Sequence, residues 1–298
     1  MADEPVPLRL VPTGGTAPTP PVFERVAVVG LGLMGASLAM AARHAWPSAL
    51  VIGVDANDVL ETAVRMHAID LGADDLVVAA EADLVVLAAP LAENARLLGE
   101  LAGVLTGEAV ITDTGSAKRL MLEAAIGLPP RLTFIGGHPL AGAPRRGIEH
   151  ARGDLYQGRP WILTPPSSMP PAVSRLEAFI RGVGAMPRTM TADQHDHVLA
   201  YLSHLPQLVV SALTQVIGEE VGETGLSLAG RGLLDTARLA ASPGSTWKDV
   251  YAANADEVRA ALDALTDTLT LLRGRLEQGE VIEGLFDSAN FWRKTLVD

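Results

Sequence analysis

The sequence predicts two folded domains: a doubly wound α/β domain with a mostly parallel sheet, followed by an all-α domain. Short Val-rich apolar runs alternate with helix-like segments over residues 22–190, which is typical of a parallel sheet covered by helices. One of these runs leads into a Gly-x-Gly-x-x-Gly turn. Residues 191–298 are expected to form helices, and residues 1–21, rich in Pro, Gly and Thr, predict a flexible tail.

The glycine-rich turn predicts a dinucleotide site in a Rossmann domain. It follows the apolar run 26–29, and Asp55 ends the next apolar run, 20 residues beyond Gly35. In such a site Gly30 makes the tight turn, Gly32 lets the backbone approach a pyrophosphate, and Gly35 lets the helix pack on the strand. The acid binds the ribose, and its charge would repel the 2′-phosphate of NADP, so NAD is expected. The alternative is a glycine turn in another kind of α/β protein.

The other elements of the α/β domain follow from apolar runs and helix signals. Ligands of a doubly wound sheet bind beyond the carboxyl ends of its strands, so the segments that follow the strands are the candidate sites. The expected strands cover 26–29, 50–55, 75–80, 83–90, 109–113, 132–135, 161–165 and 185–190, and the expected helices follow the glycine turn and cover 59–72, 93–104 and 170–183.

Two segments after strand ends carry candidate chemistry. Ser116, within residues 113–118, suits a helix cap as well as a ligand contact, whereas Lys118 is expected at the surface. His138, within residues 136–142, is expected in a loop at the carboxyl end of a strand, flanked by glycines and a proline. That setting favours binding or catalysis over a role in the core.

The helical domain begins with a capping-box pattern, formed by Thr191 and Gln194. A long helix is expected to follow, with a kink at Pro206. His195 and His204 fall on opposite sides of a straight helix, so they are not expected to bind a metal together. A polar face beside the kink suits a substrate pocket. This face holds Asp196, Ala200, Ser203 and Gln207.

The last long helix carries an apolar stripe with heptad spacing. Such a stripe forms either a dimer seam or the core of a helical bundle, and the spacing alone favours the core. Its members are Val258, Leu262, Leu265, Leu269, Leu272 and Leu276.

Composition narrows the classes of partner. The 298 residues include 23 Lys and Arg against 35 Asp and Glu, a net charge of −12, which argues against nucleic acid and anionic membranes as partners. The absence of cysteine excludes disulfides, thiolate metal sites and a cysteine nucleophile. No apolar run reaches the ~18 residues of a membrane span, and no signal peptide is recognised, so a cytoplasmic protein is expected.

Five motifs in register give the chain a family resemblance. Together they cover about residues 23 to 255, and the sequence resembles the prephenate and arogenate dehydrogenases of tyrosine biosynthesis. The motifs are Gly30-Leu-Gly32-Leu-Met-Gly35, Asp113-Thr-Gly-Ser116-Ala-Lys118, Gly137-His138-Pro139-Leu-Ala-Gly142, His195-Asp196 with Ser203-His204-Leu-Pro206, and Asp235-Thr-Ala-Arg238 with Trp247 downstream.

The resemblance implies an NAD-dependent oxidative decarboxylation by a homodimer. His138 would accept the proton of the substrate hydroxyl, and Ser116 would bond the same hydroxyl or orient His138. Arg238 would bind a substrate carboxylate, and Asp235 could hold Arg238 in place.

The resemblance also implies a full set of site residues and no metal. The substrate contacts would be Arg238, Ser203, His204, Gln207, Arg231 and Trp247, supported by Asp235, Asp196 and His195. The cofactor contacts would be Gly30, Gly32, Leu33, Met34, Gly35, Asp55, Ala89, Pro90, Asp113 and Gly115.

The preferred substrate is prephenate, with arogenate as the alternative. Gln207 stands where the family often has a second histidine, and Leu234 replaces a usual basic residue, with Arg231 as an extra cation. An amino substrate would favour a carboxylate near its ammonium group, and Gln207 is uncharged. One rival function is a β-hydroxyacid dehydrogenase or imine reductase. Those enzymes place a catalytic lysine on the long linking helix. No lysine lies between Arg119 and Lys248 in this sequence, which counts against the hydroxyacid enzymes. Another is a nucleotide-sensing protein without chemistry.

Overall fold

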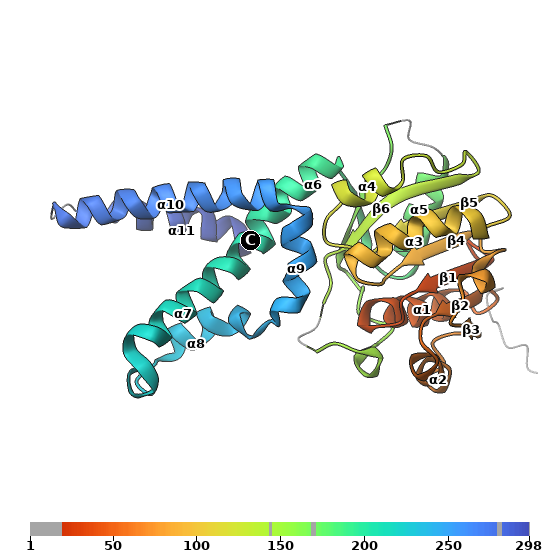
Figure 1. Ribbon diagram of the computed structural model, residues 1–298, viewed down its shortest axis with the longest axis horizontal. Coiled ribbons are helices and arrows are strands. Elements are labelled where there is room, and N and C mark those ends of the chain that lie inside the picture. The colour runs from red at the N-terminus through yellow and green to blue at the C-terminus, as the bar shows by residue number, and fades with distance from the viewer. Residues whose placement is uncertain (1–19, 143–144, 168–170, 279–281, 298) are drawn as a thin grey trace, which may run out of the picture. The chain divides into compact units, whose positions relative to one another are not determined.

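The computed structural model describes residues 20–142, 145–167, 171–278 and 282–297, so the expected tail lies almost wholly outside the described residues. The chain forms two compact units that interleave along the sequence (Figure 1). The α/β unit comprises the residues up to Ala89, Arg96–Gly115 and Ala125–Thr189. The helical unit comprises Pro90–Ala95, Ser116–Ala124 and the residues from Met190 onward. The sequence did not indicate that two short segments of the first half group with the helices.

One eight-stranded sheet forms the α/β unit, in the order β3-β2-β1-β4-β5-β6-β7-β8. Every neighbouring pair is parallel except β6 and β7, which confirms the mostly parallel fold. The strand order reverses between β1 and β4, where a doubly wound sheet binds its ligand. The strands are β1 Arg25–Val29, β2 Leu50–Val54, β3 Leu71–Ala73, β4 Leu84–Leu87, β5 Ala109–Asp113, β6 Leu132–Pro139, β7 Pro160–Thr164 and β8 Met186–Thr189.

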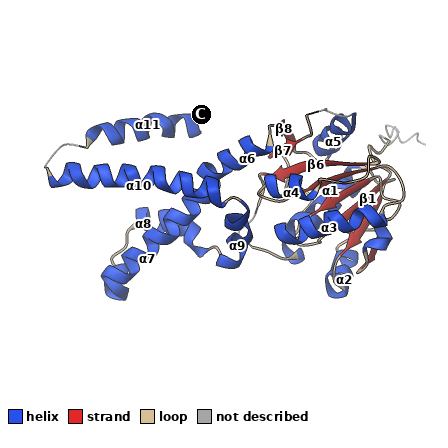
Figure 2. Cartoon of the chain, turned by 45° about the horizontal axis from the view of Figure 1, so that its top comes forward, coloured by secondary structure: helices blue, strands red, loops and turns tan. Residues whose placement is uncertain are grey.

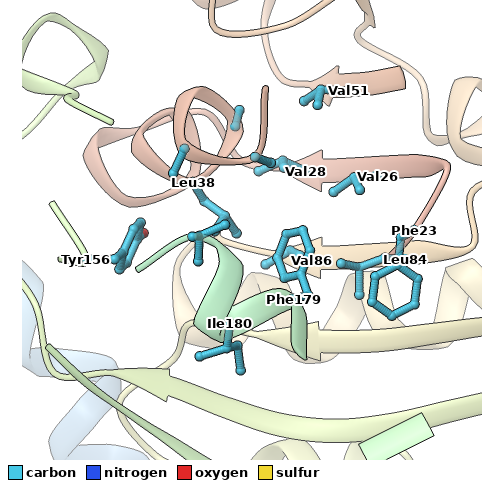
Figure 3. Close-up of a cluster of buried hydrophobic side chains, with 14 of the residues drawn as sticks. Phe23, Val26, Val28, Leu38, Val51, Leu84, Val86, Tyr156, Phe179 and Ile180 are labelled. Carbon is cyan, nitrogen blue, oxygen red and sulfur yellow. The ribbon is translucent and has the colours of Figure 1, made fainter. Parts of the chain in front are cut away.

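Helices accompany the sheet, and a single apolar core joins them. The central strands are apolar in consecutive residues because both of their faces are buried. Figure 3 shows Val26 and Val28 of β1 beside Leu84 and Val86 of β4 and Phe179 of α5. The helices are α1 Leu33–Ala45, α2 Asn57–Arg65, α3 Leu91–Val104 and α5 Pro171–Gly182, with 3₁₀ turns at Leu76–Ala79 and Ile148–His150.

The helix expected over 59–72 is shorter than the sequence suggested. It ends at Arg65, and His67 follows with a φ of 54°, a left-handed conformation that does not continue a helix. The chain then forms β3, in which Leu71 pairs with Ile52 of β2. Gly72, expected at the end of the helix, therefore lies in the edge strand.

The strand expected over 75–80 is wrong. The carboxylate of Asp75 accepts a hydrogen bond from the backbone N–H of Val77, at 2.9 Å, and starts a 3₁₀ turn instead. Aspartate competes in this way with extended structure because its short side chain caps a helical turn.

The helical unit is built around a long interrupted helix (Figure 2). Thr191 and Gln194 form the expected capping box. At the place expected for a kink, a π-helical turn, Ala200–His204, lies one residue before Pro206, which lacks an N–H to donate to the carbonyl four residues earlier. The elements are α4 Arg119–Ala124, α6 Ala192–Leu199, the π turn Ala200–His204, α7 Leu205–Leu226, α8 Arg231–Ala237, a 3₁₀ turn Arg238–Ala241, α9 Gly244–Ala253, α10 Ala255–Glu277 and α11 Glu283–Val297.

Among the described helices, none combines the length and the apolar character that crossing a membrane requires.

Candidate active site

The turn between β1 and α1 has the geometry of a phosphate-binding turn. Gly30 has a φ of 93°, and its N–H donates to the carbonyl of Val54 at 2.9 Å. A Cβ on Gly30 would lie 2.6 Å from the backbone nitrogen of Ala89, and one on Gly35 would lie 1.8 Å from the carbonyl oxygen of Gly30. A Cβ on Gly32 would meet nothing within 4 Å. Only the middle glycine faces open space, as close approach of a pyrophosphate requires.

The Asp55 carboxylate ties the end of β2 to this turn. Its Oδ2 accepts from the N–H of Leu31 at 2.6 Å, and its Oδ1 accepts from the N–H of Ala56 at 2.7 Å. A carboxylate has about four acceptor positions, so hydroxyl groups of a ribose can still donate to it. In the first turn of α1, the carbonyl of Met34 accepts from the hydroxyl of the buried Tyr156 at 2.6 Å. The residues therefore fit a dinucleotide.

The other expected cofactor contacts lie around the same turn. Leu33 and Met34 are in the first turn of α1, which has no side-chain cap, so its first N–H groups are available to a phosphate. Ala89 follows β4 and touches the glycine turn through its backbone, and Pro90 directly precedes α3.

Asp113, at the end of β5, binds the backbone of the segment that follows β5 and the backbone of β6 next to His138. Its buried carboxylate accepts from the N–H of Gly115 at 2.8 Å and from the N–H of Gly137 at 2.9 Å. His138 lies within β6, opposite Ile162 of β7, and not in the expected loop. The strand continues through the glycines because β7 returns antiparallel and pairs with them, which the sequence did not reveal.

A second buried carboxylate, Asp196, organises the segment that contains Ser116. Its two oxygens accept from the backbone N–H groups of Lys118, at 2.8 Å, and Arg119, at 2.9 Å. The Nδ1 of His195 lies 2.7 Å from the same carboxylate. Lys118, expected at the surface, is fully buried. Ser116 itself is half-buried in the bend that precedes α4.

The ionisation of Asp196 follows from these contacts. Burial alone would raise the pKa of this carboxyl group, but the hydrogen bonds from His195 and from the backbone N–H groups of Arg119 and Lys118 lower it below its usual value. Asp196 is therefore ionised near neutral pH and already has four donors, counting the 3.3 Å contact with Arg119 Nε.

Arg119, Asn254 and Asp256 belong to the same cluster, although sequence reasoning gave none of them a role. Arg119 binds the carboxylate of Asp256 through two nitrogens, at 2.7 and 2.6 Å, and donates to Oδ1 of Asn254 at 2.8 Å. The pairing raises the pKa of Arg119 and lowers that of Asp256 to about 2. The only sequence signal was that Arg119 directly follows a recognised motif.

His204 is buried at the end of the π turn and is surrounded by aromatic rings. Its Nδ1 lies 3.3 Å from Nδ2 of Asn254, and its carbonyl accepts from the hydroxyl of Tyr251 at 3.2 Å. The ring of Trp247 lies edge-on, with centroids 6.2 Å apart. Among the described residues, neither Nε2 of His204 nor Nε1 of Trp247 has a hydrogen-bond partner, although both atoms are buried.

His204 is neutral at physiological pH. Burial lowers the pKa of its imidazole to about 4, because the charged form loses hydration. The charge of Asp196 acts in the opposite direction and that of His195 in the same direction.

The remaining expected substrate residues lie in the π turn, on α7 and α8, and in the turn after α8. Gln207 is buried, and its amide nitrogen donates to the carbonyl of Leu239 at 2.9 Å, which ties α7 to the turn that begins at Arg238. Arg238 is exposed, and Ser203 is half-buried in the π turn. Asp235, expected to hold Arg238, instead lies 3.7 Å from Nε of Arg231 in an exposed ion pair.

The described residues contain no group of three or more His, Asp or Glu side chains arranged to hold a metal ion.

Two family models match the chain in succession. The description of the first is prephenate dehydrogenase, nucleotide-binding domain, over residues 38–187, and that of the second is prephenate dehydrogenase, dimerization domain, over residues 191–287. A prephenate dehydrogenase of Bacillus subtilis (strain 168) is 32% identical over 270 residues, which are 88% of this chain and 72% of that protein. The chain belongs to the prephenate dehydrogenase family.

Solved structures of the family agree with the fold. A prephenate dehydrogenase from A. aeolicus, in complex with hydroxyphenyl propionate and NAD+, superposes with a TM-score of 0.84 at 27% identity and covers 92% of this chain and 98% of that one. An arogenate dehydrogenase of Synechocystis gives a TM-score of 0.81 at 29% identity, over 92% and 100% of the two chains. Membership of this family therefore favours a prephenate dehydrogenase over the hydroxyacid dehydrogenase, imine reductase and sensor alternatives.

Proposed function

We propose that the protein is an NAD-dependent prephenate dehydrogenase, which converts prephenate to 4-hydroxyphenylpyruvate with loss of CO₂. The observation that carries the proposal is the successive match to both domains of the family, with a dinucleotide turn in the first and a buried polar cluster in the second. A nucleotide-sensing protein would need the first of these features but not the second.

The reaction needs a hydride acceptor, a proton acceptor and a group that binds the substrate carboxylate. NAD, when bound, accepts the hydride from C4 of the substrate ring. His138 takes the hydroxyl proton, and Ser116 bonds the same hydroxyl or orients His138. The bond between C1 and the carboxylate then breaks, and its electron pair makes the ring aromatic as CO₂ leaves. The C4 oxygen takes the proton back from His138, which gives the phenol of the product. Arg238 binds a substrate carboxylate through its guanidinium group.

The glycine turn and Asp55 bind the dinucleotide. The first N–H groups of α1 and the backbone at Gly32 would donate to the pyrophosphate, and the Asp55 carboxylate would accept from the ribose hydroxyls. The same negative charge would repel a 2′-phosphate, which favours NAD over NADP.

The polar groups of the helical unit favour a keto substrate over an amino substrate. His204 and Trp247 each bury a nitrogen without a hydrogen-bond partner among the described residues, and a carboxylate or keto oxygen would satisfy an N–H at that position. The buried Asp196 already accepts from Lys118, Arg119 and His195, so it is not open to a substrate ammonium group.

The helical unit also forms a homodimer in this proposal. Large apolar side chains are exposed along α10 and α11, and the second family model is a dimerization domain. The most exposed of them on these two helices are Leu269, Leu271, Leu276, Phe286, Phe291, Trp292 and Leu296, between 55% and 79% exposed. We place the dimer in the cytoplasm, where the absence of cysteine is compatible with a reducing environment.

The decisive experiment is NADH formation by the purified protein, offered prephenate and arogenate side by side with NAD and NADP. Turnover of prephenate with NAD, at a kcat/KM at least about tenfold above that with arogenate, is the expected result. A preference for arogenate would assign the alternative substrate. Clear NAD binding without turnover of either compound would overturn the proposed function.

A further inference from the structure

The tautomer of His204 can be read from its neighbours. His204 is neutral, so one ring nitrogen carries a proton and the other accepts. Its Nδ1 faces the side-chain amide of Asn254. The orientation of that amide therefore decides which nitrogen of His204 carries the proton.

Two neighbours that cannot exchange roles fix the amide of Asn254. The guanidinium group of Arg119 can only donate, and its Nη2 lies 2.8 Å from one atom of the amide, which must be Oδ1. The backbone carbonyl of Asp196 can only accept, and it lies 2.8 Å from the other atom, which must be Nδ2. The second hydrogen of Nδ2 remains for His204, so Nδ1 of His204 accepts and Nε2 carries the proton.

The arrangement is held from outside as well. Arg119 also binds both oxygens of Asp256 at the start of α10, and it contacts the Asp196 carboxylate on α6. Its planar guanidinium therefore has little freedom to rotate away from Asn254. Asn254 itself is fully buried, so water does not compete for its amide.

We propose that Asn254 is a positioning residue that, held by Arg119, fixes His204 with its proton on Nε2 and so offers an N–H to an acceptor oxygen of the substrate. The inference rests on the proposed function for the identity of that oxygen, a carboxylate or keto group. It does not need that function for the tautomer. A buried N–H without a partner costs free energy in the free protein, and a bound acceptor removes this cost.

The first test needs no substrate. The full-length protein is labelled with ¹⁵N-histidine, and long-range ¹H–¹⁵N correlation spectra at neutral pH report which ring nitrogen of each of the seven histidines is protonated. The His204 signals are assigned by their loss in His204→Leu. We expect a proton on Nε2 only in the wild type. Asn254→Asp replaces the donor with a carboxylate, so Nδ1 of His204 should become protonated.

The second test separates positioning from folding. Asn254→Leu should raise KM for prephenate about five- to tenfold and leave kcat within twofold. Without the amide, the proton of His204 is no longer fixed on Nε2, and the reacting atoms are not changed. Gln215→Leu is the matched control. Its exposed amide bonds to Glu219 in the same unit, and it should leave both constants unchanged.

Two results would overturn the proposal: a proton on Nδ1 of His204 in the wild type, or an Asn254→Asp spectrum in which Nδ1 stays unprotonated. An unchanged KM in Asn254→Leu would overturn the part of the proposal in which His204 Nε2–H binds the substrate, while the spectra would still decide the tautomer. Absence of turnover in the wild type would count against the proposed function alone, since the spectra decide the tautomer without it.

Discussion

The two units of the chain differ in the kinds of side chain that they bury. The α/β unit buries whole apolar strands and helix faces in one core, and four polar side chains are buried among its described residues. In the described part of the helical unit, seven polar or charged side chains are buried, including Lys118, His195 and Asp196. Among the residues that the structure describes, 24 large apolar side chains are exposed, and 17 of them lie in the helical unit.

This difference indicates a division of work. In the proposed function, the α/β unit would present backbone groups to the cofactor. The helical unit would use its interior for polar recognition and its exposed apolar side chains for association with a second copy, since exposed apolar patches mark interaction sites.

Replacing His138 should separate chemistry from cofactor binding within the α/β unit. We expect His138→Asn to lower kcat roughly 10²–10⁴-fold, because the proton acceptor is lost, and to leave the Kd for NAD within twofold. Stopped-flow NADH formation and calorimetric titration with NAD measure the two quantities. A loss of NAD affinity instead would assign His138 to the cofactor site.

A charge introduced on α11 should dissociate the proposed dimer. Trp292→Asp places a carboxylate on a side chain that is 62% exposed in the single chain, and we expect it to weaken association at least about 100-fold in Kd. Sedimentation velocity at micromolar concentration measures the change.

The matched control for this charge lies in the other unit. Ile126 is 81% exposed in the α/β unit, so Ile126→Asp should leave the sedimentation coefficient unchanged. If the wild type sediments as a monomer at micromolar concentration, the role assigned to the helical surface is wrong.

Removing the charge of Asp55 should relax cofactor selection. We expect Asp55→Ser to shift the ratio of kcat/KM for NAD over NADP toward NADP by about tenfold, because a 2′-phosphate no longer meets a carboxylate. Asp58→Ser, three residues further on and exposed, is the control. An unchanged ratio in Asp55→Ser would refute its assignment to the ribose.

The smallest effect is expected on stability, at Asp256, the partly exposed partner of Arg119. Asp256→Asn should lower the free energy of unfolding at pH 7 by about 1 kcal/mol or less, because the ion pair with Arg119 is partly exposed and screened by water. Glu277→Gln, in a long exposed ion pair with Arg273, should change it less. Urea unfolding measures both.

The same pair has a defined pH dependence. Since the folded-state pKa of Asp256 is about 2, below the unfolded value near 3.8, its stabilisation is present above pH 4 and is lost as the pH falls toward 2. The difference between wild type and Asp256→Asn should therefore vanish over that range. A difference that persists at pH 2 would show that the pair acts otherwise than through ionisation.

The features that the sequence predicted well are local in the chain. The glycine turn, the strand before it and the capping box at Thr191 each depend on residues within a few positions of one another. Asp75 is an exception among the local features, because its capping of a 3₁₀ turn competes with the strand that the apolar run predicts.

The features that the sequence did not predict depend on distant partners. The backbone N–H of the buried Lys118 donates to Asp196, 78 positions away, and Arg119 binds Asp256, 137 positions away. His138 lies in a strand because β7 returns beside it. No pattern near these residues reports such pairings.

Calorimetric titration of the wild type and His204→Leu, each with NAD and with 4-hydroxyphenylpyruvate, tests the division of work most directly. The product keeps the keto-acid side chain of prephenate, so we expect its Kd to rise at least about tenfold in the variant while the Kd for NAD changes less than twofold. An unchanged Kd for 4-hydroxyphenylpyruvate, or an equal loss for NAD, would contradict the account.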